Sequence, residues 1–185
     1  YGYNTDAYGF MRHLNLTAPM WKKKEGHITI IGAGGASRAI MWSFLKENKT
    51  DIRLINRSKE RGLKLIKDMK KLFPLSKIHF SSDLSEALIN CSILVNCSSL
   101  GMSGQPKLKL NIESMNKDSI VYDIVYTPLV TELLHDAKRL NYTAIDGLGM
   151  LLNQAVPAFE MWHHRKVTVS ESLKKIALAH LEGAK

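Results

Sequence analysis

A glycine-rich turn in the first third of the chain carries the clearest chemical signal. Gly32 follows an apolar run directly, and a helical pattern begins at Ala36. In such a turn one glycine permits a tight bend and the next lets the backbone approach a pyrophosphate, which then sits on the free N–H groups of the helix. Ser37 stands where a third glycine is usual and is small enough for close packing of helix on strand. The turn predicts a dinucleotide site formed by Gly32, Ala33, Gly34, Gly35 and Ala36.

The end of the second apolar run indicates which dinucleotide is bound. An NAD enzyme normally has Asp or Glu about 20 residues after the turn, where the carboxylate binds the ribose 2′-hydroxyl. Guanidinium groups instead bind phosphate through forked hydrogen bonds, and cations in the first turn of a helix are unfavourable unless an anion is bound. This chain has no acid at that place, and we expect NADP to be held there by Asn56, Arg57, Ser58, Lys59 and Arg61. Arg57 could also stack on the adenine of either dinucleotide.

The elements that must position these residues alternate between short apolar runs and helical patterns. Strands are predicted at 28–31, 52–55, 78–80, 93–95, 120–122 and 143–145, and helices at 36–46, 59–72, 83–90 and 129–140. Repeated strand–helix–strand units pair in parallel through right-handed crossovers. We therefore predict an α/β fold of Rossmann type, with a doubly wound, mostly parallel six-stranded sheet in the order 3-2-1-4-5-6 and helices on both faces.

Local signals predict where several elements begin. Asp83 and Glu86 form a capping box for the helix at 83–90, and Thr127 with Pro128 predicts the start of the helix at 129–140. Residues 21–26 predict an exposed linker turn.

Two helices are expected outside the alternation, one at 6–14 and an amphipathic one at 170–181. The second carries an apolar stripe, which consists of Leu173, Ile176, Ala177 and His180.

Composition argues against several other classes of protein. The 185 residues carry a formal net charge of +9, but the lysines are spread over expected linkers and helix faces without interleaved aromatic residues, so no nucleic-acid partner is expected. No run approaches the roughly 20 apolar residues of a membrane helix, and we expect a cytoplasmic protein without a membrane partner. Cys91 and Cys97 lie by an apolar run, and His163 and His164 close a helix, so neither a disulfide nor a metal site is expected.

Four further stretches resemble the shikimate dehydrogenase family at places typical of that family. They are residues 2–6 (GYNTD) with Gly9 and Phe10, 96–102 (NCSSLGM), 122–128 (YDIVYTP) and 146–155 (DGLGMLLNQA). With the glycine-rich turn and residues 56–58 they span residues 2–155 in the family's order. On these motifs the chain is similar to the NADP-binding part of a shikimate dehydrogenase.

The resemblance implies the reversible reduction of 3-dehydroshikimate to shikimate by hydride transfer from NADPH, as in chorismate and aromatic amino acid biosynthesis. It matches Asp6 to a catalytic carboxylate that works with a lysine, because the reacting hydroxyl must exchange a proton with a group within about 3 Å. Tyr126 and Gln154, together with Asp6, would bind the substrate. Further implied contacts with the cofactor are Ser98, Ile124, Gly147 and Met150. Each of these three residues, taken singly, has a structural alternative to substrate binding. Asp6 could be a helix cap, Tyr126 a core aromatic residue and Gln154 a surface residue.

The family's substrate-binding domain, which carries the lysine, matches nothing in this chain and is expected to precede Tyr1. We expect an interdomain junction helix at 1–14, an NADP-binding domain at 15–165 and a C-terminal helix at 166–185 that packs on the substrate domain. The apolar stripe of that helix, if uncovered, would allow a homodimer.

The substrate preference and the class of protein stay open at this point. Alternatives are a quinate/shikimate dehydrogenase, another NADP enzyme such as a methylenetetrahydrofolate dehydrogenase, and a non-catalytic NADP-binding module. Converging polar groups such as Asp6 and Gln154 favour an enzyme over a module, which has no use for them.

Overall fold

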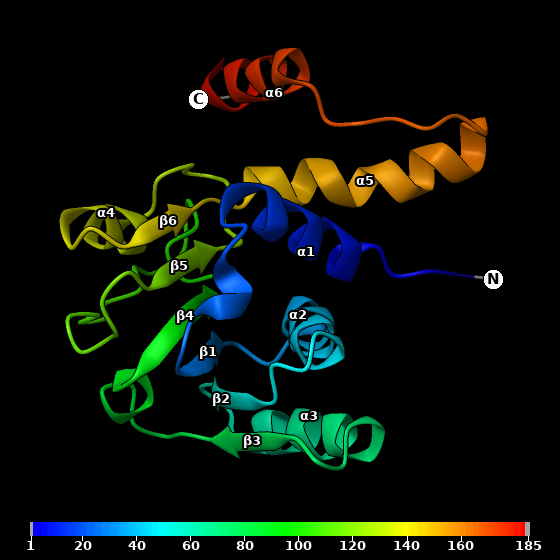
Figure 1. The fold of residues 1–185 in the computed structure, drawn as a ribbon. Helices are drawn as coiled ribbons and strands as arrows, with labels where there is room; N and C mark the ends of the chain where they lie inside the picture. Colours follow the sequence, from blue (N-terminus) through cyan, green and yellow to red (C-terminus); the bar gives the residue numbers. More distant parts are fainter. Residues whose placement is uncertain (1, 184–185) are drawn as a thin grey trace.

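A six-stranded parallel sheet forms the centre of the computed structural model, which describes residues 2–183 (Figure 1). The strands are β1 (His27–Ile31), β2 (Asp51–Ile55), β3 (Lys77–Phe80), β4 (Cys91–Asn96), β5 (Ile120–Asp123) and β6 (Thr143–Ile145). Their order is β3-β2-β1-β4-β5-β6, and every neighbouring pair is parallel. The predicted fold class and strand order are confirmed.

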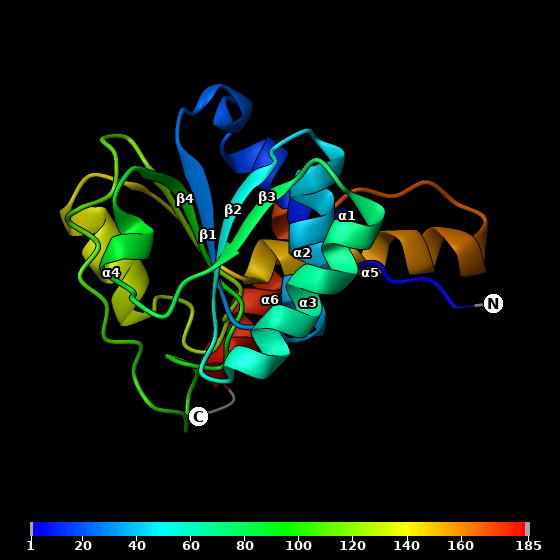
Figure 2. The same ribbon diagram turned by 90° about the horizontal axis from the view of Figure 1, so that it is seen from below.

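Side chains alternate between the two faces of the sheet and divide the core in two. One face, with Ile30 and Val95, packs against the helices α1 (Asp6–Thr17), α2 (Gly35–Lys46), α3 (Lys59–Leu72) and α5 (Leu148–His163). The other face, with Leu94 and Val121, packs against the 3₁₀ turn η2 (Glu86–Leu88), the helix α4 (Glu132–Arg139) and the loop between β4 and β5. Figure 2 shows these two layers on opposite sides of the sheet. Strands buried on both faces explain why β1, β4 and β5 are apolar runs without alternation.

The helix predicted at 83–90 is wrong, because only η2 forms there. The capping contact itself exists, since Oδ1 of Asp83 accepts hydrogen bonds from the backbone N–H of Ser85 at 2.8 Å and of Glu86 at 3.3 Å. However, the carbonyl oxygen of Ala87 accepts hydrogen bonds from Nε2 of His27 (2.8 Å) and Oγ1 of Thr29 (2.6 Å), both on β1. These bonds occupy a carbonyl that a longer helix would use in its own ladder. Contacts with the sheet therefore end the helical turn.

The predicted start of α4 is also wrong. The helix begins at Glu132, and its N-cap is Thr131 rather than Thr127. Oγ1 of Thr131 accepts a hydrogen bond from the backbone N–H of Leu134 (3.4 Å) and donates one to Oδ2 of Asp123 (2.7 Å). Because the Thr131 side chain satisfies both a helix end and a buried carboxylate, it decides where α4 begins.

The segment at 21–26, predicted as an exposed linker turn, is mostly exposed, but its first residue, Trp21, belongs to the core. It begins with the 3₁₀ turn η1 (Trp21–Lys23), and Trp21 is 0% exposed. The indole N–H donates a hydrogen bond to Oδ1 of Asn15 (2.7 Å), and the ring packs edge-on against Phe44. Burial of this large ring, with its N–H satisfied, outweighs the polar character of the surrounding lysines.

The helices at the two ends of the chain differ in whether their apolar residues are buried. The predicted first helix forms as α1, which packs along α5 and buries Phe10 and Leu14 in the main core. The last helix, α6 (Glu171–Gly183), follows an extended segment beyond α5 (Figure 1), and Leu173 and Ile176 of its stripe are exposed. Tyr1 and residues 184–185 of the predicted end segments lie outside the described residues. Within residues 2–183 no helix has the length and apolar character that crossing a membrane requires.

Candidate functional site

The glycine-rich turn joins β1 to α2 and opens at the carboxyl edge of the sheet. Gly32 has φ +107°, its N–H donates a hydrogen bond to the carbonyl of Ile55 (2.7 Å), and a Cβ there would lie 2.9 Å from the carbonyl oxygen of Cys97. A Cβ on Gly34 or Gly35 would meet no atom within 4 Å, and no side chain caps the start of α2. The backbone of the turn is therefore accessible, and the N-terminus of α2 can receive an anion.

The two cysteines, at the start of β4 and directly after it, are free thiols of low reactivity. Cys91 is buried on β4, and burial raises its pKa to about 11. Burial also raises the pKa of Cys97, which directly follows β4. Thiols with raised pKa are protonated at neutral pH and are poor nucleophiles.

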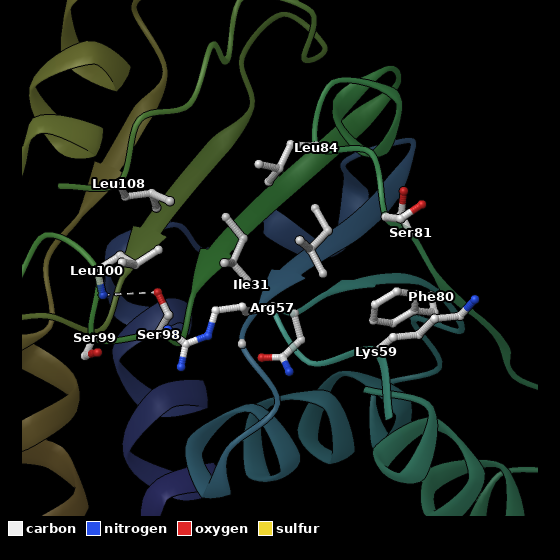
Figure 3. A pocket seen from close by; sticks show the side chains of 14 residues that line it. Ile31, Arg57, Lys59, Phe80, Ser81, Leu84, Ser98, Ser99, Leu100 and Leu108 are labelled. Atoms are coloured by element: carbon white, nitrogen blue, oxygen red, sulfur yellow. Dashed lines mark hydrogen bonds between the residues drawn. The ribbon is translucent and has the colours of Figure 1, made fainter. Parts of the chain in front are cut away.

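A pocket of about 620 Å³ lies beside the turn, across the ends of β1, β2, β3 and β4. Figure 3 shows that it extends from Lys59 and Phe80 at one end to Leu100 and Leu108 at the other. Its size is in the range of small-molecule sites. The described residues that line it include two cations and no acid: Ile31, Gly32, Ile55, Asn56, Arg57, Lys59, Phe80, Ser81, Ser82, Leu84, Ser98, Ser99, Leu100 and Leu108. An anionic ligand with an apolar part fits such a lining.

Five of the predicted cofactor contacts line this pocket, namely Gly32, Asn56, Arg57, Lys59 and Ser98. Nδ2 of Asn56 donates a hydrogen bond to the carbonyl of Ser58 (2.8 Å), and Oγ of Ser58 accepts one from the backbone N–H of Arg61 (3.3 Å). Asn56 and Ser58 thus shape the start of α3. The side chains of Arg57 and Lys59 are exposed and free to reach an anion.

Sequence analysis missed the apolar wall of the pocket, in particular Phe80. Phe80 lies at the end of β3 and packs on α3, where a Cβ on Gly62 would come within 2.5 Å of the ring. Gly62 therefore gives the ring its place beside Lys59. An isolated glycine within a helix was the available signal, because such a residue often has a packing reason.

The residues implied for substrate binding lie in a second region, around α1 and α5. A Cβ on Gly9 would lie 2.6 Å from the backbone nitrogen of Gln154, and one on Gly149 would collide with the imidazole of His13. The two helices are therefore in close contact along their length (Figure 1). Asp6 at the start of α1 and Gln154 in the middle of α5 therefore lie on neighbouring helices.

The structure tests the alternative roles of single residues in this region. Asp6 does not cap α1, because the N-cap is Thr5 and the backbone N–H of Asp6 donates a hydrogen bond to Oδ1 of Asn4 (3.0 Å). Oδ2 of Asp6 instead accepts a hydrogen bond from Nδ2 of Asn4 (3.2 Å). Tyr126, in the loop after β5, is 39% exposed and is not a core residue, and Gln154 is half-buried. None of Asp6, Tyr126 and Gln154 lines the pocket of 620 Å³.

The loop after β5 and the start of α5 meet closely. The N–H of Gly147 donates a hydrogen bond to the carbonyl of Val125 (3.2 Å), and any Cβ on Gly147 would collide with the carbonyl of Ile124. Met150 is only 5% exposed and belongs to the main core. Ile124 and Gly147 therefore adjoin each other.

A partly buried histidine and a buried tyrosine connect α1 to the sheet in the same region. Nδ1 of His13 and the hydroxyl of Tyr122 lie 2.7 Å apart. Burial lowers the pKa of His13, partly opposed by Asp146, and burial raises the pKa of Tyr122. Both side chains are therefore neutral at neutral pH, and their hydrogen bond joins two elements that are distant in sequence.

Comparison with known proteins agrees with the motifs and the geometry. Residues 17–151 match the family model described as shikimate/quinate 5-dehydrogenase. The chain belongs to the shikimate/quinate 5-dehydrogenase family. This member of the family is 42% identical over 178 residues to the shikimate dehydrogenase (NADP(+)) of Paramagnetospirillum magneticum. The match covers 96% of this chain and 63% of that protein. It thus spans a little less than two thirds of the length of this relative.

Solved structures of other shikimate/quinate 5-dehydrogenases have the same fold. The quinate dehydrogenase from Corynebacterium glutamicum in complex with NAD has a TM-score of 0.86 at 25% identity, over 95% of this chain and 62% of that chain. The shikimate 5-dehydrogenase from Thermus thermophilus in complex with NADP(H) and shikimate has a TM-score of 0.75 at 28% identity, over 90% of this chain and 59% of that chain.

Proposed function

We propose that the protein is an NADP-dependent shikimate dehydrogenase, and that this chain forms its cofactor-binding part. The observation that carries the proposal is the pocket at the carboxyl edge of the sheet, lined by Asn56, Arg57 and Lys59 and by no described acid. The accessible turn at Gly34 and Gly35 lies between this pocket and α2. The NADP(+) in the name of the 42% identical relative supports the same cofactor.

In this proposal the cofactor lies across the edge of the sheet. The turn at 32–36 would hold the pyrophosphate, and Arg57 and Lys59, which are exposed cations beside the pocket, would bind the 2′-phosphate. When bound, NADP(H) would supply the hydride acceptor for the oxidation of shikimate and the hydride donor for the reverse reaction. Ile124 and Gly147, which adjoin each other, would line the cleft beside the nicotinamide.

The proposed substrate contacts come from Asp6, Tyr126 and Gln154. When shikimate is oxidised, its carbon loses a hydride to the cofactor and its hydroxyl loses a proton, and we assign proton exchange to Asp6 together with a lysine elsewhere in the protein. Asn4 donates a hydrogen bond to one oxygen of Asp6, which holds the carboxylate in place and leaves its other oxygen available. Tyr126 and Gln154 orient the substrate hydroxyls from the loop after β5 and from α5.

Cofactor preference provides the first test. In the full-length protein, calorimetry should give at least about tenfold tighter binding of NADP(H) than of NAD(H), or about 1.4 kcal/mol. Arg57→Ala should weaken NADP binding and leave NAD binding nearly unchanged, because only NADP carries the 2′-phosphate. Arg165→Ala, at an exposed arginine outside the pocket, is the matched control. Equal or reversed affinities of the wild type would contradict the assignment.

The role of Asp6 provides the second test. Asp6→Asn in the full-length protein should lower kcat by roughly 10² to 10⁴ and leave NADP affinity intact. The amide can still accept the hydrogen bond from Asn4, so the start of α1 should keep its structure. A variant with normal kcat and reduced stability would show that Asp6 is only structural.

A quinate dehydrogenase is the second candidate, favoured by the TM-score of 0.86 to a quinate dehydrogenase in complex with NAD. Turnover of shikimate and quinate with each dinucleotide separates the two. Absence of turnover with all four combinations, together with tight NADP binding, would instead favour a non-catalytic module.

A further inference from the structure

A buried amide lies at the end of β4, next to the pocket. Asn96 is 0% exposed, and its Nδ2 donates hydrogen bonds to Oδ1 of Asp123 (2.9 Å) and to the carbonyl of Leu100 (3.1 Å). Its Oδ1 accepts hydrogen bonds from the backbone N–H (3.1 Å) and the hydroxyl (2.7 Å) of Ser98. An asparagine has two donors and two acceptor lone pairs to offer here, so its capacity is fully used. Asn96 therefore determines the path of residues 97–100, which include Ser98, Ser99 and Leu100 of the pocket wall.

Asp123 holds the neighbouring loop in the same way. It is paired with Asn96 in the register of β4 and β5, and it is 0% exposed. Its Oδ1 also accepts a hydrogen bond from the backbone N–H of Val125 (3.1 Å), and its Oδ2 accepts one from Oγ1 of Thr131 (2.7 Å). Asp123 therefore determines how the chain leaves β5 toward Ile124 and Tyr126.

Further contacts join the same two loops. The N–H of Ser103 donates a hydrogen bond to the carbonyl of Thr127 (2.8 Å). Gly101 lies against Thr131, since a Cβ on Gly101 would be 3.7 Å from the methyl carbon of that threonine. Thr131 itself is 2% exposed and fixes the start of α4. The loop that borders the pocket and the loop after β5 thus form one connected unit.

Stability alone does not account for a carboxylate at this place. Burial raises the pKa of Asp123, and the hydrogen bonds from Thr131, Val125 and Asn96 oppose that rise. A buried polar network of this kind is often no more stable than apolar residues of the same volume, and its attested use is to specify one arrangement. The arrangement specified here is the position of Ser98 and Leu100 relative to Ile124 and Tyr126.

We propose that Asn96 and Asp123 are positioning residues, which set the cofactor-pocket loop at 97–101 against the substrate-side loop at 124–131 in the geometry that hydride transfer needs. This inference rests on the proposed function. The two loops border different parts of the cleft, and a displacement of about 1 Å between them can cost about a hundredfold in rate.

Exchange of the amide and the carboxylate tests the pair in the full-length protein. Asn96→Asp places two carboxyl groups together and removes the donor to Leu100, and it should lower kcat by about tenfold to a hundredfold, with a smaller change in the Kd of NADP. Asp123→Asn removes the charge and replaces one of the two acceptor oxygens with an amide donor, and should also lower kcat. The double variant restores an amide–carboxylate pair in the reverse sense, and should recover at least about fivefold of the loss in kcat seen in Asn96→Asp.

A milder pair of variants covers the case in which Asn96→Asp does not fold. Thr131→Val removes the hydroxyl that donates to Asp123, whereas Thr131→Ser keeps it and is the matched control. We expect Thr131→Val to lower kcat by at least about threefold and Thr131→Ser to retain it. Hydrogen exchange should show lower protection in Thr131→Val at both 97–101 and 124–131, because the loops are linked.

The outcomes separate this inference from the proposed function. If the wild type turns shikimate over, and the folded variants at 96, 123 and 131 keep kcat within about twofold of the wild type and are only less stable, the network is structural and the inference is overturned. If the wild type shows no turnover, the proposed function fails, and hydrogen exchange in Thr131→Val then tests whether the two loops are linked. Loss of protection in both loops supports their linkage, and loss confined to one loop overturns it.

Discussion

His13, which is partly buried, and His27, which is buried, have pKa values that the fold lowers, in both cases mainly through burial. His13 contacts Tyr122, with Asp146 raising its pKa and Lys174 of α6 lowering it. His27 bonds the carbonyl of Ala87, which partly opposes the lowering. Between the lowered folded pKa and the unfolded value of about 6.5, the folded state binds fewer protons than the unfolded state. The contribution of the two neutral histidines to the free energy of unfolding is therefore complete above about pH 6.5. It is lost as the pH falls from that value toward the lowered pKa of the folded state.

The melting temperature should accordingly fall as the pH is lowered from about 7 to 5. His13→Gln removes one titrating group and should reduce the slope by at most about 1.4 kcal/mol of unfolding free energy per pH unit. His79→Gln, at an exposed position on β3, is the control for the exchange of histidine for glutamine itself. Asp123, with its raised pKa, contributes the opposite slope at lower pH, so the informative quantity is the difference between variant and wild type. Identical slopes for His13→Gln and the wild type would contradict the assignment.

At the scale of secondary-structure elements, the contact between α1 and α5 is the one on which the proposed site depends. It brings Asp6 and Gln154 onto neighbouring helices, and Gly9 allows the close approach. Gly9→Ala would gain about 1 kcal/mol of helix propensity, but its Cβ would meet backbone atoms of Gln154, which cannot move without moving α5.

We expect Gly9→Ala to lower the free energy of unfolding by about 1–3 kcal/mol and to lower kcat as well, because the two helices are forced apart. Chemical denaturation and steady-state kinetics measure the two effects. Gly2→Ala is the control, since a Cβ there meets nothing within 4 Å. An unchanged or higher unfolding free energy for Gly9→Ala would show that α5 adapts to the added methyl group.

At the scale of the whole molecule, binding and turnover should separate. The pocket is built from residues between Ile31 and Leu108, whereas the chain spans 63% of the length of the relative from Paramagnetospirillum magneticum. We expect the 185-residue chain to bind NADP(H) with nearly the affinity of the full-length protein and to show no measurable oxidation of shikimate. Substrate positioning can lower the activation barrier by about 7–11 kcal/mol, and among the described residues we have proposed only Asp6, Tyr126 and Gln154 for it. Turnover by the chain alone at an ordinary enzyme rate would disprove this division.

The sequence by itself determined the six strands, their order, the glycine-rich turn and the basic residues after β2. These features depend on apolar runs, on glycine and charge at short spacing, and on the handedness of crossovers, all of which are readable along neighbouring residues. The resemblance to a family added Asp6, Tyr126 and Gln154 as proposals, and the structure places Asp6 and Gln154 on adjacent helices.

Tertiary structure decided the features whose partners are far apart in the chain. The carbonyl of Ala87 is bonded by Thr29, 58 positions away, which ended a helix that the local capping box predicted. Burial against Phe44 made Trp21 a core residue. Thr131 and Asp123 are only 8 positions apart, but their hydrogen bond, which sets the start of α4, depends on burial of the carboxylate at the end of β5. His13 and Tyr122 are 109 positions apart. Local patterns carry no information on such pairs, because each contact exists only after the sheet has brought its strands and helices together.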